Sequence, residues 1–151
     1  MDYIRIYTDG GSTGNPGPGG WAAVIIDREK EVKLSGGEAA TTNNRMEMTA
    51  AIKALEYIDC NIKKIGNIVL STDSEYLKKG ITEWIINWKR NNWKTAAKKE
   101  VKNKDLWARL DELNNRIKVE WKWVKGHAGD RYNELCDALV SEERKRFEYF
   151  N

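Results

Sequence analysis

The spacing of apolar residues changes along the chain, and it predicts strands first and helices later. Ile4–Gly10 is rich in β-branched and aromatic residues and is typical of a strand, and Trp21–Asp27 and Glu31–Ser35 follow as short strands around a charged turn. We therefore predict a three-stranded antiparallel meander. Gly10–Gly20, which contains both prolines, is predicted to be a loop, and it lacks both the Lys-Ser/Thr of a phosphate-binding loop and a following helix.

Helical spacing begins after the meander. Asn44–Ile58 has apolar residues three and four positions apart, and Asn44 with Glu47 matches a capping box at its start. Ser74–Gly80 is predicted to be a short helix that ends at its glycine. The remaining predictions are a strand over Ile68–Ser74, a helix over Asp105–Arg116, a strand over Lys118–Lys125 and a helix over Tyr132–Phe147.

This order of elements predicts an α/β fold. A sequential meander followed by strands that alternate with helices implies a mixed five-stranded sheet, with three antiparallel strands, two parallel strands, right-handed crossovers and helices packed on its faces. We expect residues 1–151 to form a single domain, because 151 residues with 40% hydrophobic content are enough to bury a core without disulfides or structural zinc.

Two strands end in the same way. Ile4–Gly10 and Ile68–Ser74 each finish in Thr, Asp and a small residue, so Asp9 and Asp73 lie where their strands end. If the strands are parallel neighbours, about 4.8 Å apart, the two carboxylates converge at the edge where open α/β sheets bind ligands. Their repulsion calls for a cation, and a hard divalent ion such as Mg²⁺ fits oxygen ligands.

Each acid also has a purely structural interpretation. Glu47 fits the capping box, Asp73 fits an N-cap of the short helix, and Asp9 fits a turn before Gly10. Glu47 nevertheless lies just before the apolar face of its helix, where a side chain can point along the edge of the sheet. Both interpretations are open from the residues alone.

Asp137 and His127 add two further candidates near the C-terminal end. Asp137 lies among apolar residues of the last predicted helix, where burying an unpaired carboxylate would cost free energy unless a metal or a hydrogen bond offset it. His127 is the only histidine, and glycines flank it in Lys125–Asp130. A lone histidine is usually structural, but an exposed imidazole near carboxylates is suited to moving protons at neutral pH.

Charge and composition narrow the class of protein. The longest apolar run, Trp21–Ile26, is far shorter than the roughly 20 residues that span a bilayer, so we expect neither a membrane segment nor export. Cys60 and Cys136 have no metal-ligand spacing and are expected to be reduced packing residues of a cytoplasmic protein. We expect a monomer.

The net charge of +3 is distributed unevenly. Lys78–Lys104 contains nine basic and two acidic residues and three tryptophans, namely Trp84, Trp88 and Trp93. Clustered cations with large aromatics favour a nucleic-acid surface. The alternative is a solvated amphipathic helix whose tryptophans face the core, since Trp84 and Trp88 are four residues apart.

Together these motifs closely resemble bacterial type 1 ribonuclease H, over about residues 3–146. The matching segments occur in family order, and they are Tyr7–Gly10, Gly14–Gly20, Thr42–Glu47, Thr72–Ser74, Lys125–Gly129 and Asn133–Asp137. The resemblance implies a single catalytic domain in which Asp9, Glu47, Asp73 and Asp137 hold the metal. It also implies that His127 assists turnover and that Lys78–Lys104 is a basic helical protrusion, or handle, that binds the hybrid duplex.

The resemblance further assigns substrate contacts residue by residue. Asn15, Thr42 and Arg45 are expected to bind a phosphate of the DNA strand, and Asn43 and Asn44 to contact the minor groove. The backbone near Gly10 is expected to meet RNA 2′-hydroxyls, and Trp84, Lys89 and Arg90 to bind substrate from the handle. The chain departs from the pattern at Glu75, where relatives often carry a neutral glutamine.

The implied activity is endonucleolytic hydrolysis of the RNA strand of RNA/DNA hybrids, without sequence specificity. The resemblance implies products with 5′-phosphate and 3′-hydroxyl ends and catalysis with two Mg²⁺ ions, for which Mn²⁺ could substitute. Two alternatives remain from the residues: a DNA-directed nuclease of the same fold, and a non-catalytic module that binds nucleic acid through the basic stretch alone.

Overall fold

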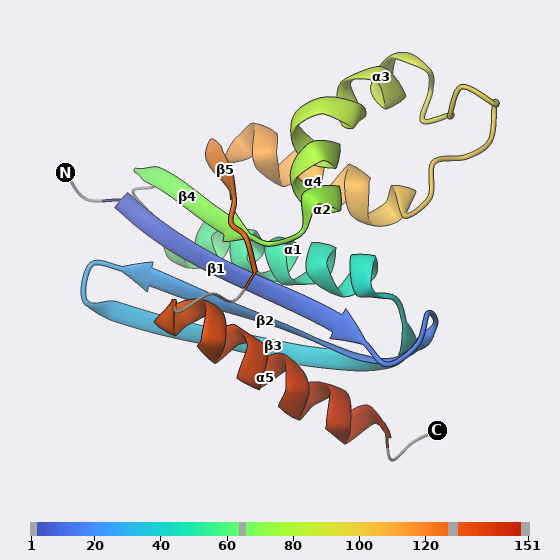
Figure 1. Ribbon diagram of the computed structural model, residues 1–151. Coiled ribbons are helices and arrows are strands. Elements are labelled where there is room, and N and C mark those ends of the chain that lie inside the picture. Colours follow the sequence, from blue (N-terminus) through green and yellow to red (C-terminus); the bar gives the residue numbers. More distant parts are fainter. Residues whose placement is uncertain (1–2, 64–65, 127–129, 149–151) are drawn as a thin grey trace.

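A computed structural model describes residues 3–63, 66–126 and 130–148, which form a five-stranded sheet with helices on both faces (Figure 1). The strand order is β3-β2-β1-β4-β5; β2 is antiparallel to both β1 and β3, whereas β4 and β5 are parallel to β1. This confirms the predicted mixed sheet. The strands are β1 (Tyr3–Ser12), β2 (Gly17–Asp27), β3 (Lys30–Thr41), β4 (Asn67–Thr72) and β5 (Val119–Trp123).

The first hairpin is longer than predicted. β1 continues to Ser12 and β2 begins at Gly17, so most of the predicted loop Gly10–Gly20 is strand. The glycines serve close packing: a Cβ at Gly20 would meet the backbone of Val140. Helices approach the sheet so closely here that only glycine fits at these strand positions. The same glycines led the sequence analysis to predict a loop.

β2 is buried on both faces and so separates two apolar clusters. Ala23 and Ile25 belong to the larger cluster, whereas Ala22 and Val24 belong to a smaller one together with Cys136. A strand covered on both sides needs apolar residues at successive positions. The unbroken apolar run Trp21–Ile26 therefore belongs to β2, the middle strand of the three-stranded meander.

Three long helices cover the sheet. They are α1 (Asn43–Asn61), which packs on β1 and β2, α4 (Lys104–Arg116), which packs on α1, and α5 (Arg131–Glu148), which lies across β1, β2 and β3 on the other face (Figure 1). The capping box predicted from Asn44 and Glu47 is wrong. Thr42 is the N-cap of α1, and its Oγ1 accepts a hydrogen bond from the backbone N–H of Arg45 at 3.2 Å.

The basic stretch projects from the sheet as a nearly continuous helical segment (Figure 1). It comprises α2 (Glu75–Lys79), the π-helical turn η1 (Gly80–Trp84) and α3 (Ile85–Arg90). α2 ends at Lys79 with Gly80 as its C-cap, as predicted, but the helical path continues directly into η1. Gly80 is buried in a helical conformation, and a Cβ there would overlap the ring of Trp107, so this glycine also makes room for an indole.

Aromatic rings anchor this projection to the core. Tyr76, Trp84, Trp88 and Trp107 form a chain of ring contacts with centroids 5.3 to 6.0 Å apart. Trp88 and Trp93 pack against the larger apolar cluster, whereas Trp84 remains 36% exposed. Two of the three tryptophans therefore serve the core, as the alternative interpretation predicts, and the nucleic-acid surface stays a prediction that Trp84 leaves open.

The two cysteines lie in different environments. Cys136 is buried and its thiol contacts the carbonyl oxygen of Tyr7 at 3.3 Å, which supports the predicted packing role. Cys60 is exposed, so that prediction is wrong for it, because it falls on the outer side of the last turn of α1. Within the described ranges, no helix combines the length and apolarity needed to cross a bilayer.

The fit of Gly80 against Trp107 gives the first testable prediction. Gly80→Ala should lower the free energy of unfolding by about 1 to 3 kcal/mol, because the added methyl overlaps a fully buried indole. Urea unfolding followed by circular dichroism would measure it. In the matched background Trp107→Phe, which removes the overlapped ring atoms, the same alanine should cost clearly less; equal costs in both backgrounds would contradict the packing explanation.

Candidate metal and nucleic-acid site

Asp9 and Asp73 lie side by side at one edge of the sheet. β1 and β4 pair in parallel with Tyr7 opposite Ser71, and the same register, extended by two residues, brings Asp9 level with Asp73. Asp9 is itself within β1, opposite Ala22 of β2, so the alternative of a turn residue is wrong. One carboxylate oxygen from each of Asp9, Glu47 and Asp73 lies within 4.8 Å of the other two.

Asp73 does not cap the helix that follows it. Ser74 is the N-cap of α2, and its hydroxyl accepts a hydrogen bond from the backbone N–H of Leu77 at 3.1 Å. The indole Nε1 of Trp123 donates to the carbonyl oxygen of Asp73 at 3.0 Å and so ties the end of β5 to this segment. The structure therefore leaves the Asp73 carboxylate directed to the acidic cluster rather than to a helix end.

Glu47 reaches the cluster because Gly10 lets α1 come very close to β1. A Cβ at Gly10 would lie within 3 Å of backbone atoms of Met46 and Glu47. The Gly10 backbone N–H donates to Glu47 Oε1 at 3.2 Å, and only 7% of Glu47 is exposed. Its carboxylate therefore belongs to the sheet edge and has no part in capping α1.

The surroundings of Glu47 disfavour its charge. Burial, followed by the nearby charges of Asp9 and Asp73, raises the pKa of Glu47 well above its ordinary value, and only the Gly10 N–H opposes this. Among the described residues, nothing forms a hydrogen bond with the buried Glu47 Oε2. A buried carboxylate oxygen without a donor, beside two further carboxylates, fits a hard divalent cation.

Asp137 lines the same surface depression as the three carboxylates but is not grouped with them. It is an exposed residue of α5. The expectation that Asp137 is surrounded by apolar residues is wrong. Cys136, Val140 and Glu143 form the inward stripe of α5, and Asp137 lies next to that stripe on the surface.

The predicted loop histidine cannot be placed. His127 lies outside the described residues, which stop at 126 and resume at 130. Asp130 begins the next described segment, where its carboxylate accepts hydrogen bonds from the backbone N–H groups of Tyr132 and Asn133 and so starts α5. The role expected for His127 stays a prediction.

The polar residues predicted to contact substrate gather beside the acids. Gly10, Asn43 and Asn44 line the depression that holds the three carboxylates. Asn15 is linked to them, because its Oδ1 accepts a hydrogen bond from the Asn43 backbone N–H at 3.2 Å, and Thr42 lies next in the chain. The N-terminus of α1 thus joins the predicted contact residues to the acidic cluster.

Arg45 is engaged within the protein. Its guanidinium forms a two-pronged ion pair with Asp105, at 2.9 and 3.1 Å, and also donates to Asn103 Oδ1 at 3.2 Å. This pairing raises the pKa of Arg45 and lowers that of Asp105. The side chain of Asp105 is 65% exposed, so the pair connects α1 to α4 at the surface.

The predicted handle residues differ in their accessibility. Arg90 is exposed, whereas the Lys89 ammonium lies 3.1 Å from Asp111 of α4, so its charge is partly neutralised. The basic turn beyond α3 is ordered by an isolated antiparallel backbone β-bridge between Lys94 and Glu100 and by a hydrogen bond from the Val101 N–H to the Trp93 carbonyl oxygen. Lys94, Lys98 and Lys99 of this turn are exposed, so their charges, with that of Arg90, are the available part of the handle.

Sequence reasoning missed one cation of the depression. Arg144 of α5 lines the depression together with Asp137 and Ser141. Glu75 of α2, which forms an ion pair with Lys79 at 3.7 Å, also lines it. Asp137, Ser141 and Arg144 are four and seven residues apart, a spacing that places them on one side of a helix. That spacing was the available signal for Arg144.

Comparisons with known proteins agree with this geometry. Residues 1–145 match the family model described as RNase H. A curated relative named Ribonuclease H, from Phenylobacterium zucineum (strain HLK1), is 59% identical over 137 residues, which cover 91% of this chain and 87% of the relative. The sequence similarity thus spans nearly the whole of both chains.

Solved structures show the same fold. LC9-RNase H1, described as a type 1 RNase H with the type 2 active-site motif, is similar with a TM-score of 0.84 and 29% identity, over 97% of this chain and 74% of that one. LC11-RNase H1 in complex with RNA/DNA hybrid is similar with a TM-score of 0.67 and 27% identity, over 95% and 97% of the two chains.

Crowding of charge around Glu47 gives the second prediction. In metal-free protein, Glu47→Gln should raise the melting temperature at pH 7, because burial beside two aspartates disfavours ionisation of the wild-type carboxyl and the amide carries no charge. Since folding raises the pKa of Glu47, wild-type stability should fall as pH rises from the ordinary glutamate value of 4.5 through the raised value. Melting curves measured in chelator between pH 4 and 8 should show the Glu47-dependent loss of stability in the wild type and not in Glu47→Gln.

Added Mg²⁺ provides the complementary measurement. It should raise the melting temperature of the wild type, and raise that of Glu47→Gln less, because one carboxylate ligand is gone. The exposed turn residue Glu29 supplies the control, since Glu29→Gln should behave like the wild type in chelator and in Mg²⁺. Equal stabilisation of wild type and Glu47→Gln by Mg²⁺ would contradict a metal site at this cluster.

Proposed function

The chain belongs to the RNase H family, and from that premise we propose that it is an endonuclease that hydrolyses the RNA strand of RNA/DNA hybrids. One observation carries the proposal: three carboxylates converge at the sheet edge, and one of them has a buried oxygen without a donor. The products would carry 5′-phosphate and 3′-hydroxyl ends. Free cysteines support a reducing compartment, and we propose a cytoplasmic monomer.

Asp9, Glu47 and Asp73 are the residues proposed to hold Mg²⁺, with Asp137 as a fourth ligand from α5. Two such ions, for which Mn²⁺ could substitute, would supply a water of lowered pKa and neutralise charge on the phosphate. Oxygen ligands suit these ions because they are hard cations that retain positions for water and phosphate.

The protein's own contribution is placement. The Gly10 N–H fixes one oxygen of Glu47, and the closely packed α1 and β1 prevent that carboxylate from turning away. His127 is proposed to take part in proton transfer or product release, and Glu75 adds a fifth carboxylate at the edge of the depression.

Recognition of the hybrid is proposed to use both strands. Asn43, Asn44 and the backbone at Gly10 would contact the minor groove and RNA 2′-hydroxyls, the group that distinguishes RNA from DNA. Arg45, with Asn15 and Thr42, would bind a phosphate of the DNA strand, exchanging its contact with Asp105 for one with the duplex.

The handle is proposed to bind the duplex beyond the point of cleavage. Trp84 is 36% exposed and Arg90 lies on the surface of α3, so an aromatic face and a cation are both available. Lys89 would contribute less, because Asp111 already pairs with it.

The third prediction tests the reaction itself. Asp9→Asn should reduce Mg²⁺-dependent cleavage of an RNA/DNA hybrid by about a thousandfold or more, because the cluster loses a charged ligand. Asp27→Asn is the matched control at the end of β2, and it should retain wild-type cleavage. Comparison of hybrid with DNA duplex and RNA duplex at one stated salt concentration identifies the substrate. Full activity of Asp9→Asn would disprove the assignment, and equal cleavage of DNA duplex would favour the DNA-directed alternative.

The fourth prediction concerns the handle. Neutralising three lysines of the basic turn should weaken hybrid binding and reduce the slope of log affinity against log salt by about 0.9 for each phosphate that the variant no longer neutralises. Fluorescence anisotropy at several salt concentrations measures both quantities. Neutralising three exposed lysines away from the turn should leave the slope unchanged, and an unchanged slope in the turn variant would contradict its role. The turn set is Lys94, Lys98 and Lys99, and the control set is Lys30, Lys33 and Lys63.

A further inference from the structure

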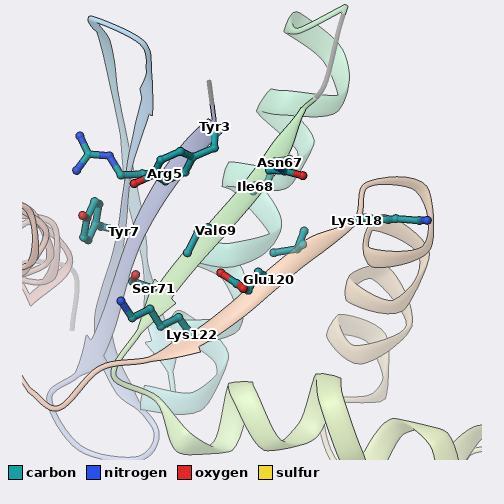
Figure 2. A pocket seen from close by; sticks show the side chains of 11 residues that line it. Tyr3, Arg5, Tyr7, Asn67, Ile68, Val69, Ser71, Lys118, Glu120 and Lys122 are labelled. Atoms are coloured by element: carbon teal, nitrogen blue, oxygen red, sulfur yellow. The ribbon is translucent and has the colours of Figure 1, made fainter. Parts of the chain in front are cut away.

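A second hollow lies on the face of the sheet that α5 leaves open. α5 lies across β1, β2 and β3, and beside it a cavity of about 800 Å³ extends over β1, β4 and β5 (Figure 2). Val69 and Ser71 of β4 form part of its lining, between Arg5 and Tyr7 of β1 and Glu120 and Lys122 of β5. None of these residues takes part in the function proposed above.

Charge in this hollow favours an anionic ligand. Arg5, Lys118 and Lys122 contribute three cations, and Glu120 contributes the one carboxylate among the lining residues. Lys118 directly precedes β5 and Lys122 lies near its end, and both are exposed, so their ammonium groups can move to meet phosphates spaced along a chain.

Aromatic rings border the same hollow. Tyr3 is 49% exposed, and Tyr7 stacks on Tyr132 of α5 with centroids 5.1 Å apart. The guanidinium of Arg5 lies 5.7 Å from the centre of the Tyr132 ring. The exposed Tyr3 ring beside exposed lysines is a combination that holds single-stranded nucleic acid, since bases stack on rings and phosphates pair with cations.

The hollow is formed by the same two neighbouring strands that lead to Asp9 and Asp73. Side chains alternate along a strand, so Arg5, Tyr7 and Asp9 of β1 share one face. Ser71 lies beside Tyr7 in the parallel pairing, and Asp73 follows at the next position of the same alternation. The hollow therefore lies on the same two strands, and on the same face, as Asp9 and Asp73.

We propose that this hollow binds a single-stranded extension of the RNA strand, where that strand continues beyond the hybrid. The inference rests on the proposed function, because the RNA strand is the one placed at the acids. An acidic peptide would satisfy the cations, but it would use neither the exposed tyrosine ring nor the position of the hollow on the strands that lead to Asp9 and Asp73. Single-stranded RNA accounts for all three features.

The experiment compares hybrids with and without an extension. Anisotropy in chelator, where no cleavage occurs, would give the affinity of a blunt hybrid and of the same hybrid with a six-nucleotide RNA extension at its 5′ or 3′ end. At least one extension should tighten wild-type binding by about fivefold and steepen the salt dependence by about 0.7 for each phosphate bound. Lys118→Gln combined with Lys122→Gln should abolish that gain.

Lys30→Gln combined with Lys33→Gln, on β3, makes the same change of charge and should keep the gain. The inference is overturned if neither extension tightens wild-type binding, or if the gain survives in the Lys118 and Lys122 variant. It is also overturned if an acidic peptide, and no RNA extension, shifts the amide resonances of Ser71 and Lys122. Cleavage of the blunt hybrid with Mg²⁺, measured in parallel, tests the proposed function separately.

Discussion

Mutual repulsion of three carboxylates, held together by close packing, is the constraint on which the site depends. Asp9 and Asp73 come from adjacent parallel strands, and Glu47 is brought to them by a helix that touches the backbone of β1 at Gly10. Any larger residue at Gly10 would push α1 away and relax the repulsion. The three carboxylates therefore repel one another at the sheet edge. The packing of α1 on the larger apolar cluster offsets this unfavourable electrostatic energy.

The same packing explains why the two faces of the sheet differ. On one face, α1 and α4 bury the larger apolar cluster and support the aromatic base of the handle. On the other face, α5 covers only part of the sheet, brings Asp137 and Arg144 to the depression, and leaves β4 and β5 open. The acidic cluster and the depression around it thus lie at the sheet edge, between a fully covered face and a partly covered one.

Much of the fold was readable from the sequence because apolar periodicity reports which side of an element is buried. The parallel pairing of the two Thr-Asp strands, which the sequence offered only as a condition, is present in the structure, and α5 followed from its helical spacing. Gly20 was misleading, since glycine marks close approach as well as turns, and single-sequence patterns do not distinguish these uses. The pairing of Arg45 with Asp105, sixty residues away, has no local signal at all.

The attachment of the handle has a consequence for how such a chain can vary. Tyr76 receives hydrogen bonds from Asn103 and Trp107, so the polypeptide leaves the sheet and returns to it at one aromatic anchor. Because closing a longer or shorter loop between fixed ends changes the entropy only slowly with length, the exposed part of this excursion, residues 94–100 between Trp93 and Val101, is a modular insertion. Its length and charge can be altered while the sheet, the acids and their spacing stay as they are.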